Sequence, residues 1–197
     1  MYQHSSHADV VDLAKWPEAE QLVARCCDFL DVVQNLTPGK DLEARLNRDF
    51  GPGSEHYEAL CRQVRRGLEQ GWLAATEIAG PAYRRGKVAL PSERTRYMSI
   101  TAVYMESAAD GGEGGTLRGQ YHAHPYGEIN CVVPVSGAAP ELRGMQGWQG
   151  AGWTSPGPGT HHYPEARGGA LVALFFLPAG RISYDSAAPG MPQPASV

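Results

Sequence analysis

Two histidines and a glutamate lie close together in the middle of the chain, in the sequence Tyr-His-Ala-His-Pro-Tyr-Gly-Glu. His122 and His124 are two residues apart, so in an extended strand both side chains point to the same face. Pro125 and Gly127 permit a turn that brings Glu128 back toward both imidazoles. Two neutral nitrogens and one carboxylate form a ligand set that non-haem iron and related divalent ions use while keeping positions open for substrate. The spacing therefore predicts a metal site.

A Gly/Pro-rich segment further along the chain ends in two adjacent histidines, His161 and His162. Either of them can complete the ligand set if the fold brings this segment beside the first. His-x-His by itself also fits a polar strand face, which is the alternative interpretation of His122 and His124. The suitably spaced Glu128 and the second histidine-bearing turn favour the metal site.

Both segments resemble the motifs of the cupin superfamily. The first motif consists of a glycine, His-x-His, a glutamate and a later glycine, and the matching residues are Gly119, His122, His124, Glu128 and Gly137. The second motif reads roughly Pro-x-Gly-x-x-His and is approximated by Pro156, Gly159 and His162. Gly119 lies nearer the first histidine than is usual, Pro156 is one residue early, and the asparagine that often follows the last histidine is missing. The choice between His161 and His162 therefore stays open, although the Gly-x-x-His spacing favours His162.

The composition describes a slightly acidic globular protein. The chain has 197 residues and a formal net charge of -4. This length suits one domain with an added segment, large enough to form a core without disulfides or metals as staples. The basic residues are scattered, which argues against nucleic acid as a partner. No apolar run approaches the ~20 residues that span a bilayer, and the N-terminus lacks the apolar stretch of a signal peptide, so a cytoplasmic protein without a membrane partner is expected.

Residues 1–75 are predicted to form a helical N-terminal segment. Apolar residues recur at three- and four-residue steps over Pro17–Leu36, and a second, shorter helix is expected over about Asp41–Phe50. Ser54 has the side chain of a helix cap, and a third helix should follow it and end near Gly71. The segment is expected to pack on the domain that follows.

Residues 76–184 are predicted to form a β-barrel. Short runs alternate with turns that contain Gly and Pro, as in an all-β barrel or sandwich. The predicted strands are Leu73–Ile78, Lys87–Leu90, Arg96–Glu106, Thr116–His124, Ile129–Val135, Glu141–Met145 and Ala170–Leu177. The cupin resemblance implies a jelly roll, so the expected fold class is a mainly β, cupin-type jelly-roll barrel preceded by an α-helical segment. Residues 185–197 are expected to be a loose tail.

The predicted strand Ala170–Leu177 is apolar on both faces. Such a strand lies in the centre of a sheet, covered by core on one side and by helices or a second subunit on the other. Together with the amphipathic helices it offers more apolar surface than one small barrel should expose. A homodimer or a larger even-numbered oligomer is therefore expected.

Strand parity adds candidates for substrate binding. If His122 and His124 face inward, Gln120 and Arg118 do so as well, provided that no bulge intervenes. An inward Arg118 would suit the carboxylate of a substrate, because its guanidinium can donate two parallel hydrogen bonds. The alternative is an arginine at the solvent end of the strand.

Neighbouring strands supply further candidates. Arg96 and Arg143 are reserve candidates for the carboxylate, since each belongs to a strand predicted to line the barrel. Trp153 flanks the second motif and could contact a planar substrate ring. The candidates for a general acid or base are Tyr104, Glu106 and His161.

The two motifs and the helical segment ahead of them resemble one family more narrowly, the bacterial 4-hydroxylaminobenzoate lyases. The resemblance spans most of residues 15–185 and rests on Tyr-His-Ala-His-Pro-Tyr-Gly-Glu-Ile-Asn and Pro-Gly-Pro-Gly-Thr-His-His-Tyr-Pro. It implies a metal-dependent lyase of nitrobenzoate degradation, which converts 4-hydroxylaminobenzoate to 3,4-dihydroxybenzoate (protocatechuate) with release of ammonia.

The resemblance implies a divalent metal ion held by His122, His124, Glu128 and His162, and a small aromatic carboxylate as substrate. Iron, manganese, nickel, cobalt and zinc all accept histidine and carboxylate ligands, so the sequence does not name the ion. Two alternatives use the same fold. One is a cupin Fe(II) dioxygenase acting on a small aromatic or thiol substrate, and the other is a non-catalytic cupin that only binds a small molecule.

Overall fold

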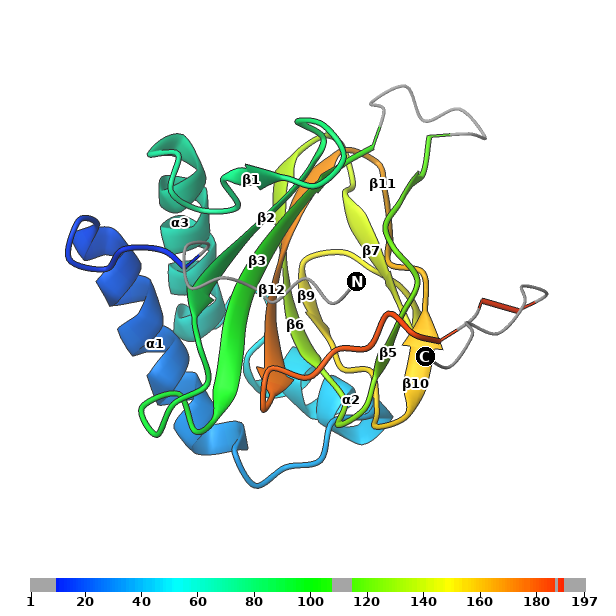
Figure 1. Ribbon diagram of the computed structural model, residues 1–197, viewed down its shortest axis with the longest axis horizontal. Coiled ribbons are helices and arrows are strands. Elements are labelled where there is room, and N and C mark those ends of the chain that lie inside the picture. The colour runs from blue at the N-terminus through cyan, green and yellow to red at the C-terminus, as the bar shows by residue number, and fades with distance from the viewer. Residues whose placement is uncertain (1–9, 108–114, 187, 190–197) are drawn as a thin grey trace.

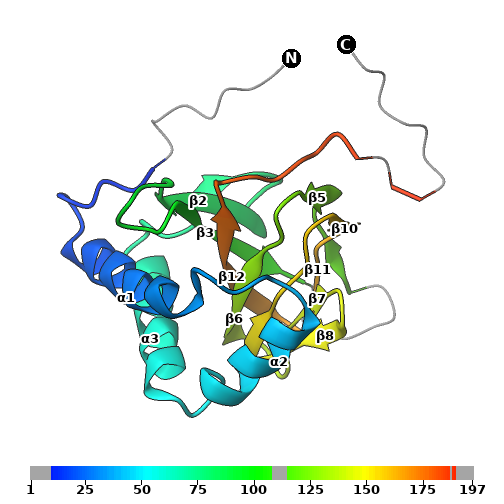
Figure 2. The same ribbon diagram turned by 90° about the horizontal axis from the view of Figure 1, so that it is seen from below.

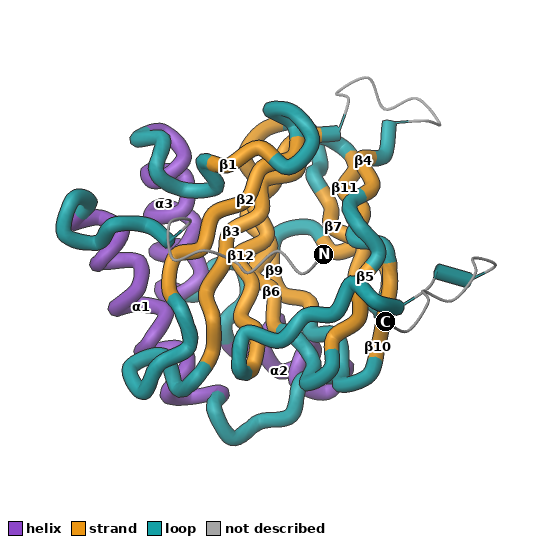
Figure 3. The backbone as a smooth tube through the Cα atoms, in the orientation of Figure 1, coloured by secondary structure: helices purple, strands orange, loops and turns teal. Residues whose placement is uncertain are grey.

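The helices of the protein lie on one side of a six-stranded antiparallel sheet, and two smaller sheets face its other side (Figure 1). The computed structural model describes residues 10–107, 115–186 and 188–189. Figure 2, the view from below, shows the helices outside the barrel. The tube in Figure 3 shows the same division between helix and strand. This arrangement is the cupin-type jelly-roll barrel with N-terminal helices that the sequence predicts. The predicted tail, 185–197, lies mostly outside the described residues.

Three helices precede the barrel, as predicted, and they are α1 (Pro17–Val33), α2 (Lys40–Asp49) and α3 (Glu55–Glu69). Pro17 opens α1, where a missing backbone N–H costs nothing. The Ser54 hydroxyl caps α3 by accepting a hydrogen bond from the Tyr57 N–H at 3.2 Å. Within the described residues, none of the helices combines the length and the apolar character that a bilayer crossing requires.

The large sheet has the strand order β1-β2-β3-β12-β6-β9. Its strands are β1 (Thr76–Glu77), β2 (Tyr83–Ala89), β3 (Met98–Glu106), β12 (Ala170–Pro178), β6 (Ile129–Ser136) and β9 (Gly152–Thr154). Helices α1 and α3 run along its outer face (Figure 1). Every neighbouring pair in this sheet is antiparallel.

The smaller sheets close the barrel opposite the large one. One pairs β5 (His122–His124) with β10 (Thr160–His162), and the other has the order β4-β11-β7-β8. The strands of the second are β4 (Leu117–Arg118), β11 (Glu165–Arg167), β7 (Glu141–Gly144) and β8 (Gly147–Gln149). Glu165 of β11 lies between Arg118 and Arg143, its partners in the two flanking strands.

Several strand predictions need correction. The predicted strand Thr116–His124 is two short strands, because residues 119–121 leave the sheet between them. Of the predicted strand Leu73–Ile78, only the two residues of β1 are in a strand, and residues 73 and 74 are buried outside any strand. Strands β8 to β11 were not predicted, since segments of three residues carry too little alternation to be recognised.

The two apolar faces of the central strand β12 pack in two separate cores. Val172, Leu174 and Phe176 pack with the helices in the larger apolar cluster. Leu171 and Ala173 belong to a second cluster inside the barrel. Both faces are therefore covered within one chain, and this strand gives no argument for a second subunit.

Trp153 lies in the helix-side core, which contradicts its predicted contact with substrate. Its side chain is fully buried, stacked on Phe29 with 4.6 Å between the ring centroids. Its indole N–H donates to the backbone oxygen of Phe50 at 2.8 Å. Since β9 presents this residue to the helices, Trp153 joins the N-terminal segment to the barrel.

Replacing Trp153 by Ala should destabilise the protein by about 3–5 kcal/mol, because it leaves a large cavity in a packed core. Denaturant unfolding followed by circular dichroism measures this change. Trp148→Ala is the matched control, since that partly buried indole contacts mainly the cation of Arg167, at 4.1 Å. The control should cost about 1 kcal/mol or less. Equal losses in the two variants would contradict the placement of Trp153.

Candidate metal centre and its cavity

Three histidine side chains from the paired strands β5 and β10 converge inside the barrel. His162 stands directly opposite His122 in the antiparallel register, and His124 lies on the same face two residues on. One nitrogen from each ring falls within a group whose members all lie within 4.8 Å of one another. This cluster contains His162 and excludes His161, in agreement with the Gly-x-x-His spacing.

The hydrogen bonds of His122 and His124 leave their Nε2 lone pairs pointing at each other. A carbonyl oxygen only accepts, so Nδ1 of His122 donates to the oxygen of Gln120 at 2.9 Å. Nδ1 of His124 likewise donates to the oxygen of Thr160 at 3.1 Å. Each neutral ring then carries its proton on Nδ1, and the two Nε2 atoms lie only 3.0 Å apart without a proton between them.

This separation fits two ligands of one metal ion. Nitrogens about 2.0–2.1 Å from a single ion lie roughly 2.8–3.4 Å apart at the usual coordination angles. Backbone carbonyls that fix the ring orientation through Nδ1 are the common support for metal-binding histidines. The donor set therefore fits a divalent cation, and without one the two lone pairs would repel.

The surroundings of the cluster disfavour protonated imidazole. Burial, together with the neighbouring His122 and His162, lowers the pKa of His124 to about 3. Burial and the proximity of His122 lower the pKa of His162 to about 4. All three rings are consequently neutral near pH 7, which is the state that coordinates a metal.

Glu128 borders the cluster through a tight turn. Gly127 has a φ of 82°, and a side chain there would also collide with Pro38, so only glycine fits. The turn places Oε1 of Glu128 at 3.8 Å from Nε2 of His124. Burial raises the pKa of Glu128 to about 7, although a hydrogen bond from Asn130 opposes the shift. The carboxylate thus lacks a cationic partner within the described residues, which a metal ion would supply.

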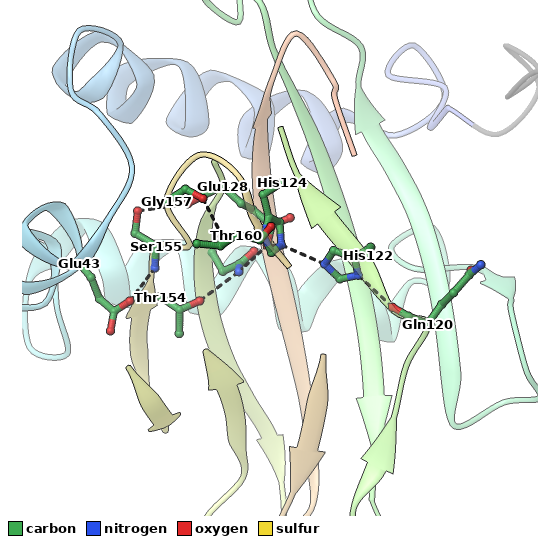
Figure 4. A network of polar contacts seen from close by, with 10 residues as sticks. Glu43, Gln120, His122, His124, Glu128, Thr154, Ser155, Gly157 and Thr160 are labelled. Atoms are coloured by element: carbon green, nitrogen blue, oxygen red, sulfur yellow. Dashed lines mark hydrogen bonds and ion pairs between the residues drawn. The ribbon is translucent and has the colours of Figure 1, made fainter. Parts of the chain in front are cut away.

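A hydrogen-bonded chain ties this turn to helix α2 (Figure 4). The buried carboxylate of Glu43 accepts from the Ser155 N–H at 2.8 Å. The Ser155 hydroxyl donates to the backbone oxygen of Glu128 at 3.1 Å, and the Glu128 N–H donates to the oxygen of Pro156 at 2.9 Å. The N-terminal helices thus hold the two motifs against each other.

The histidine cluster opens into a mainly apolar cavity between the two walls of the barrel. Its polar lining residues are His122, His162, Glu128, Asn130, Arg85, Tyr83 and Tyr184. Its apolar lining includes Val103, Met105, Leu142, Ala173, Phe175 and Ile182. Oδ1 of Asn130 is buried and has no partner among the described residues, because the amide nitrogen makes both of the Asn130 side-chain hydrogen bonds. One acceptor therefore remains available in the cavity wall.

Arg118 points out of the barrel, contrary to the expectation from parity. Leu117 packs inside the barrel, so the next residue of β4 faces outward. The interruption at residues 119–121 reverses the side-chain parity before His122. The expectation for Arg118 required an uninterrupted strand, and that condition is not met. The guanidinium of Arg118 forms a 2.7 Å ion pair with Glu165 on the outer face.

The two reserve arginines are also engaged outside the cavity. Arg143 forms a 2.8 Å ion pair with the same Glu165. Burial would raise the pKa of Glu165, but hydrogen bonds from Arg143 and Arg118 lower it. Arg96 lies in a turn before β3 and pairs with Asp31 of α1 at 2.6 Å.

The predicted acid-base candidates also lie away from the cavity. Tyr104 packs against the helix-side cluster and donates to Glu106 at 3.0 Å, because the even-numbered residues of β3 face the helices. His161 is exposed and contacts the Tyr121 hydroxyl. Gln120 offers only its backbone oxygen to His122, and its side chain is exposed.

The cavity contains four polar residues that were not chosen from the sequence, namely Tyr83, Arg85, Asn130 and Tyr184. Period-two alternation in β2 could have placed Tyr83 and Arg85 on one face, but the predicted strand began only at Lys87. Tyr184 reaches the cavity from a segment outside the named strands, and no local pattern marks it. Its ring lies edge-on to His122, with 6.0 Å between the centroids.

The sequence profile of the PnbB family, described as 4-hydroxylaminobenzoate lyase, matches residues 24–184. A protein named 4-hydroxylaminobenzoate lyase from Nocardioides sp. (strain LMS-CY) is 52% identical over 170 residues, which are 86% of this chain and 96% of that protein. Another with the same name, from Pseudomonas putida, is 50% identical over 173 residues, 87% of this chain and 98% of its own. Among solved structures, the DMSP lyase DddQ from Ruegeria pomeroyi DSS-3 is 16% identical with a TM-score of 0.37, covering 82% of this chain and 91% of its own.

Replacing His122, His124 or His162 by Ala should remove most of the bound metal, because each variant deletes one of three converging nitrogens. Elemental analysis of protein purified without a histidine tag measures the metal content. His161→Ala is the matched control and should keep its metal, since that ring lies outside the cluster. Two of the three variants retaining stoichiometric metal would refute the assignment. Glu128→Ala, measured in the same way, tests the fourth predicted ligand separately.

Proposed function

Because the chain belongs to the 4-hydroxylaminobenzoate lyase family, we propose that it converts 4-hydroxylaminobenzoate and water to 3,4-dihydroxybenzoate and ammonia. The similarity to two relatives of that name, over nearly their full length, carries the proposal. The atoms balance without net oxidation, so the reaction consumes neither oxygen nor a nicotinamide. The cavity, which joins a histidine cluster to apolar walls, suits a small aromatic substrate.

We assign His122, His124 and His162, with Glu128 as a fourth ligand, to hold a divalent metal ion. Such an ion supplies Lewis acidity, which stabilises negative charge that develops on an oxygen as the N–O bond weakens. Histidine and carboxylate donors are accepted by iron, manganese, nickel, cobalt and zinc alike.

The remaining cavity residues bind and orient the substrate. Val103, Met105 and Phe175 offer apolar surface to the ring and exclude water from it. The free Oδ1 of Asn130 accepts a hydrogen bond from the hydroxylamino group, which fixes the nitrogen end of the substrate beside the histidines. Tyr184, whose ring lies edge-on to His122, forms part of the cavity wall beside the substrate ring.

We also propose that the protein is a homodimer or a larger even-numbered oligomer. Large side chains are available for such an interface, since Tyr97, Tyr126 and Val32 are 65%, 53% and 46% exposed. Light scattering at micromolar concentration should give at least twice the mass of one chain. A monomer under these conditions would rule the proposal out.

The purified, metal-loaded protein should release one ammonia for each 4-hydroxylaminobenzoate consumed and form 3,4-dihydroxybenzoate under strictly anaerobic conditions. Coupled ammonia detection and chromatography of the product measure both. Benzoate without the nitrogen substituent is the control substrate and should release nothing. Oxygen consumption coupled to turnover would instead identify a dioxygenase, and binding without turnover would identify a non-catalytic cupin.

A further inference from the structure

A substrate carboxylate inside this barrel needs a cationic partner. Burying an unpaired carboxylate costs several kcal/mol, so proteins that take up such ligands place an arginine or lysine at the charged end. The three arginines suggested by the sequence already have carboxylate partners, because Arg118 and Arg143 share Glu165 and Arg96 pairs with Asp31. Arg118 and Arg143 line a separate cavity on the other side of His162.

Arg85 is the one arginine or lysine among the described residues that line the cavity bordered by His122, Glu128 and His162. It lies in β2 on the same face as Tyr83, and it is exposed at the edge of the cavity. Its neighbours across the large sheet are Val103 of β3, then Ala173 of β12, then Val132 of β6. This apolar row forms a floor between the cation at the rim and the wall opposite.

No carboxylate of the described residues neutralises the charge of Arg85. Among the described residues it makes no ion pair with a carboxylate, in contrast to Arg118 and Arg143. Its guanidinium lies near the phenol of Tyr184. Burial raises the pKa of that phenol, and the nearby guanidinium opposes the shift.

Tyr184 connects the cation to the metal centre in space. Its ring lies 6.0 Å from the ring of His122, and its hydroxyl end lies beside Arg85. The Tyr184 ring therefore lies between the guanidinium and the histidines. A para-substituted benzoate likewise carries its carboxylate and its substituent nitrogen at opposite ends of one six-membered ring, roughly 6 Å apart on ordinary bond lengths.

We propose that Arg85 binds the carboxylate of the aromatic substrate and sets the preference of the cavity for para-substituted benzoates over uncharged rings. The inference rests on the proposed function for the identity of the substrate. The apolar floor takes the ring, Arg85 takes the carboxylate, and the nitrogen substituent then points to the three histidines.

The test compares Arg85→Met with the wild type on two substrates, 4-hydroxylaminobenzoate and the uncharged phenylhydroxylamine. Loss of a charged hydrogen bond should lower kcat/KM for the carboxylated substrate at least tenfold, and it should change the value for phenylhydroxylamine by less than threefold, by the usual strength of such bonds. Arg118→Met is the matched control and should keep the wild-type preference, because its partner is Glu165. Arg85→Lys should restore part of the preference.

Metal content and the unfolding midpoint are measured for each variant, so that loss of fold or metal is recognised. An Arg85→Met protein that keeps both and keeps the full preference for the carboxylated substrate would overturn the inference. Equal losses on both substrates would do so as well, since they would indicate a role unrelated to the carboxylate.

Calorimetry with the non-reacting pair 4-aminobenzoate and aniline separates this inference from the proposed function. Wild-type protein should bind 4-aminobenzoate at least tenfold more tightly than Arg85→Met does, whether or not ammonia is released from 4-hydroxylaminobenzoate. Absence of ammonia with this binding difference intact would reject the lyase activity and keep the role of Arg85. Equal binding by the two proteins, or no binding by the wild type, would reject the role of Arg85.

Discussion

The site depends on one short antiparallel pairing, that of β5 with β10. This register sets His162 opposite His122 and leaves His124 on the same inner face, so three imidazoles from two distant segments meet without a long loop. Carbonyl oxygens of the surrounding backbone fix the ring orientations. The chain from Glu43 through Ser155 to Glu128 then holds the pairing against α2, and the cluster is rigid because both the strands and the helices constrain it.

Local features of the fold and site were accessible from the sequence, and features that depend on distant packing were not. His-x-His needs only strand alternation, and the Gly-x-x-His spacing favoured His162, the histidine that lies in the cluster, over His161. The helices cover the even-numbered residues of β3, so the acid-base candidate Tyr104 lies on the helix side, away from the cavity. The prediction that Arg118 faces inward was wrong because residues 119–121 interrupt the strand and reverse its parity. Such an interruption cannot be recognised from the composition of the segment.

The arginines of the barrel separate into two classes by their partners. On the outer face Glu165 accepts from both Arg118 and Arg143, which removes much of their charge from the field of the site. Arg85 faces inward without a carboxylate among the described residues, and its positive potential extends into a cavity with apolar walls. The net charge of the chain is -4, so the proposed binding of a small anion depends on this local arrangement and not on the overall charge.

The segment that carries Ile182 and Tyr184 is hydrogen-bonded to the histidine strand itself. The Ala123 N–H donates to the Ser183 oxygen at 2.7 Å, and the Ser183 N–H donates back at 3.0 Å. Strand β5 has β10 on its other side, so Ser183 occupies the backbone groups that a sheet edge would otherwise expose. Unpaired edges invite strands from other molecules. The residues that wall the cavity thus also act as a guard against intermolecular sheet formation beside the metal centre.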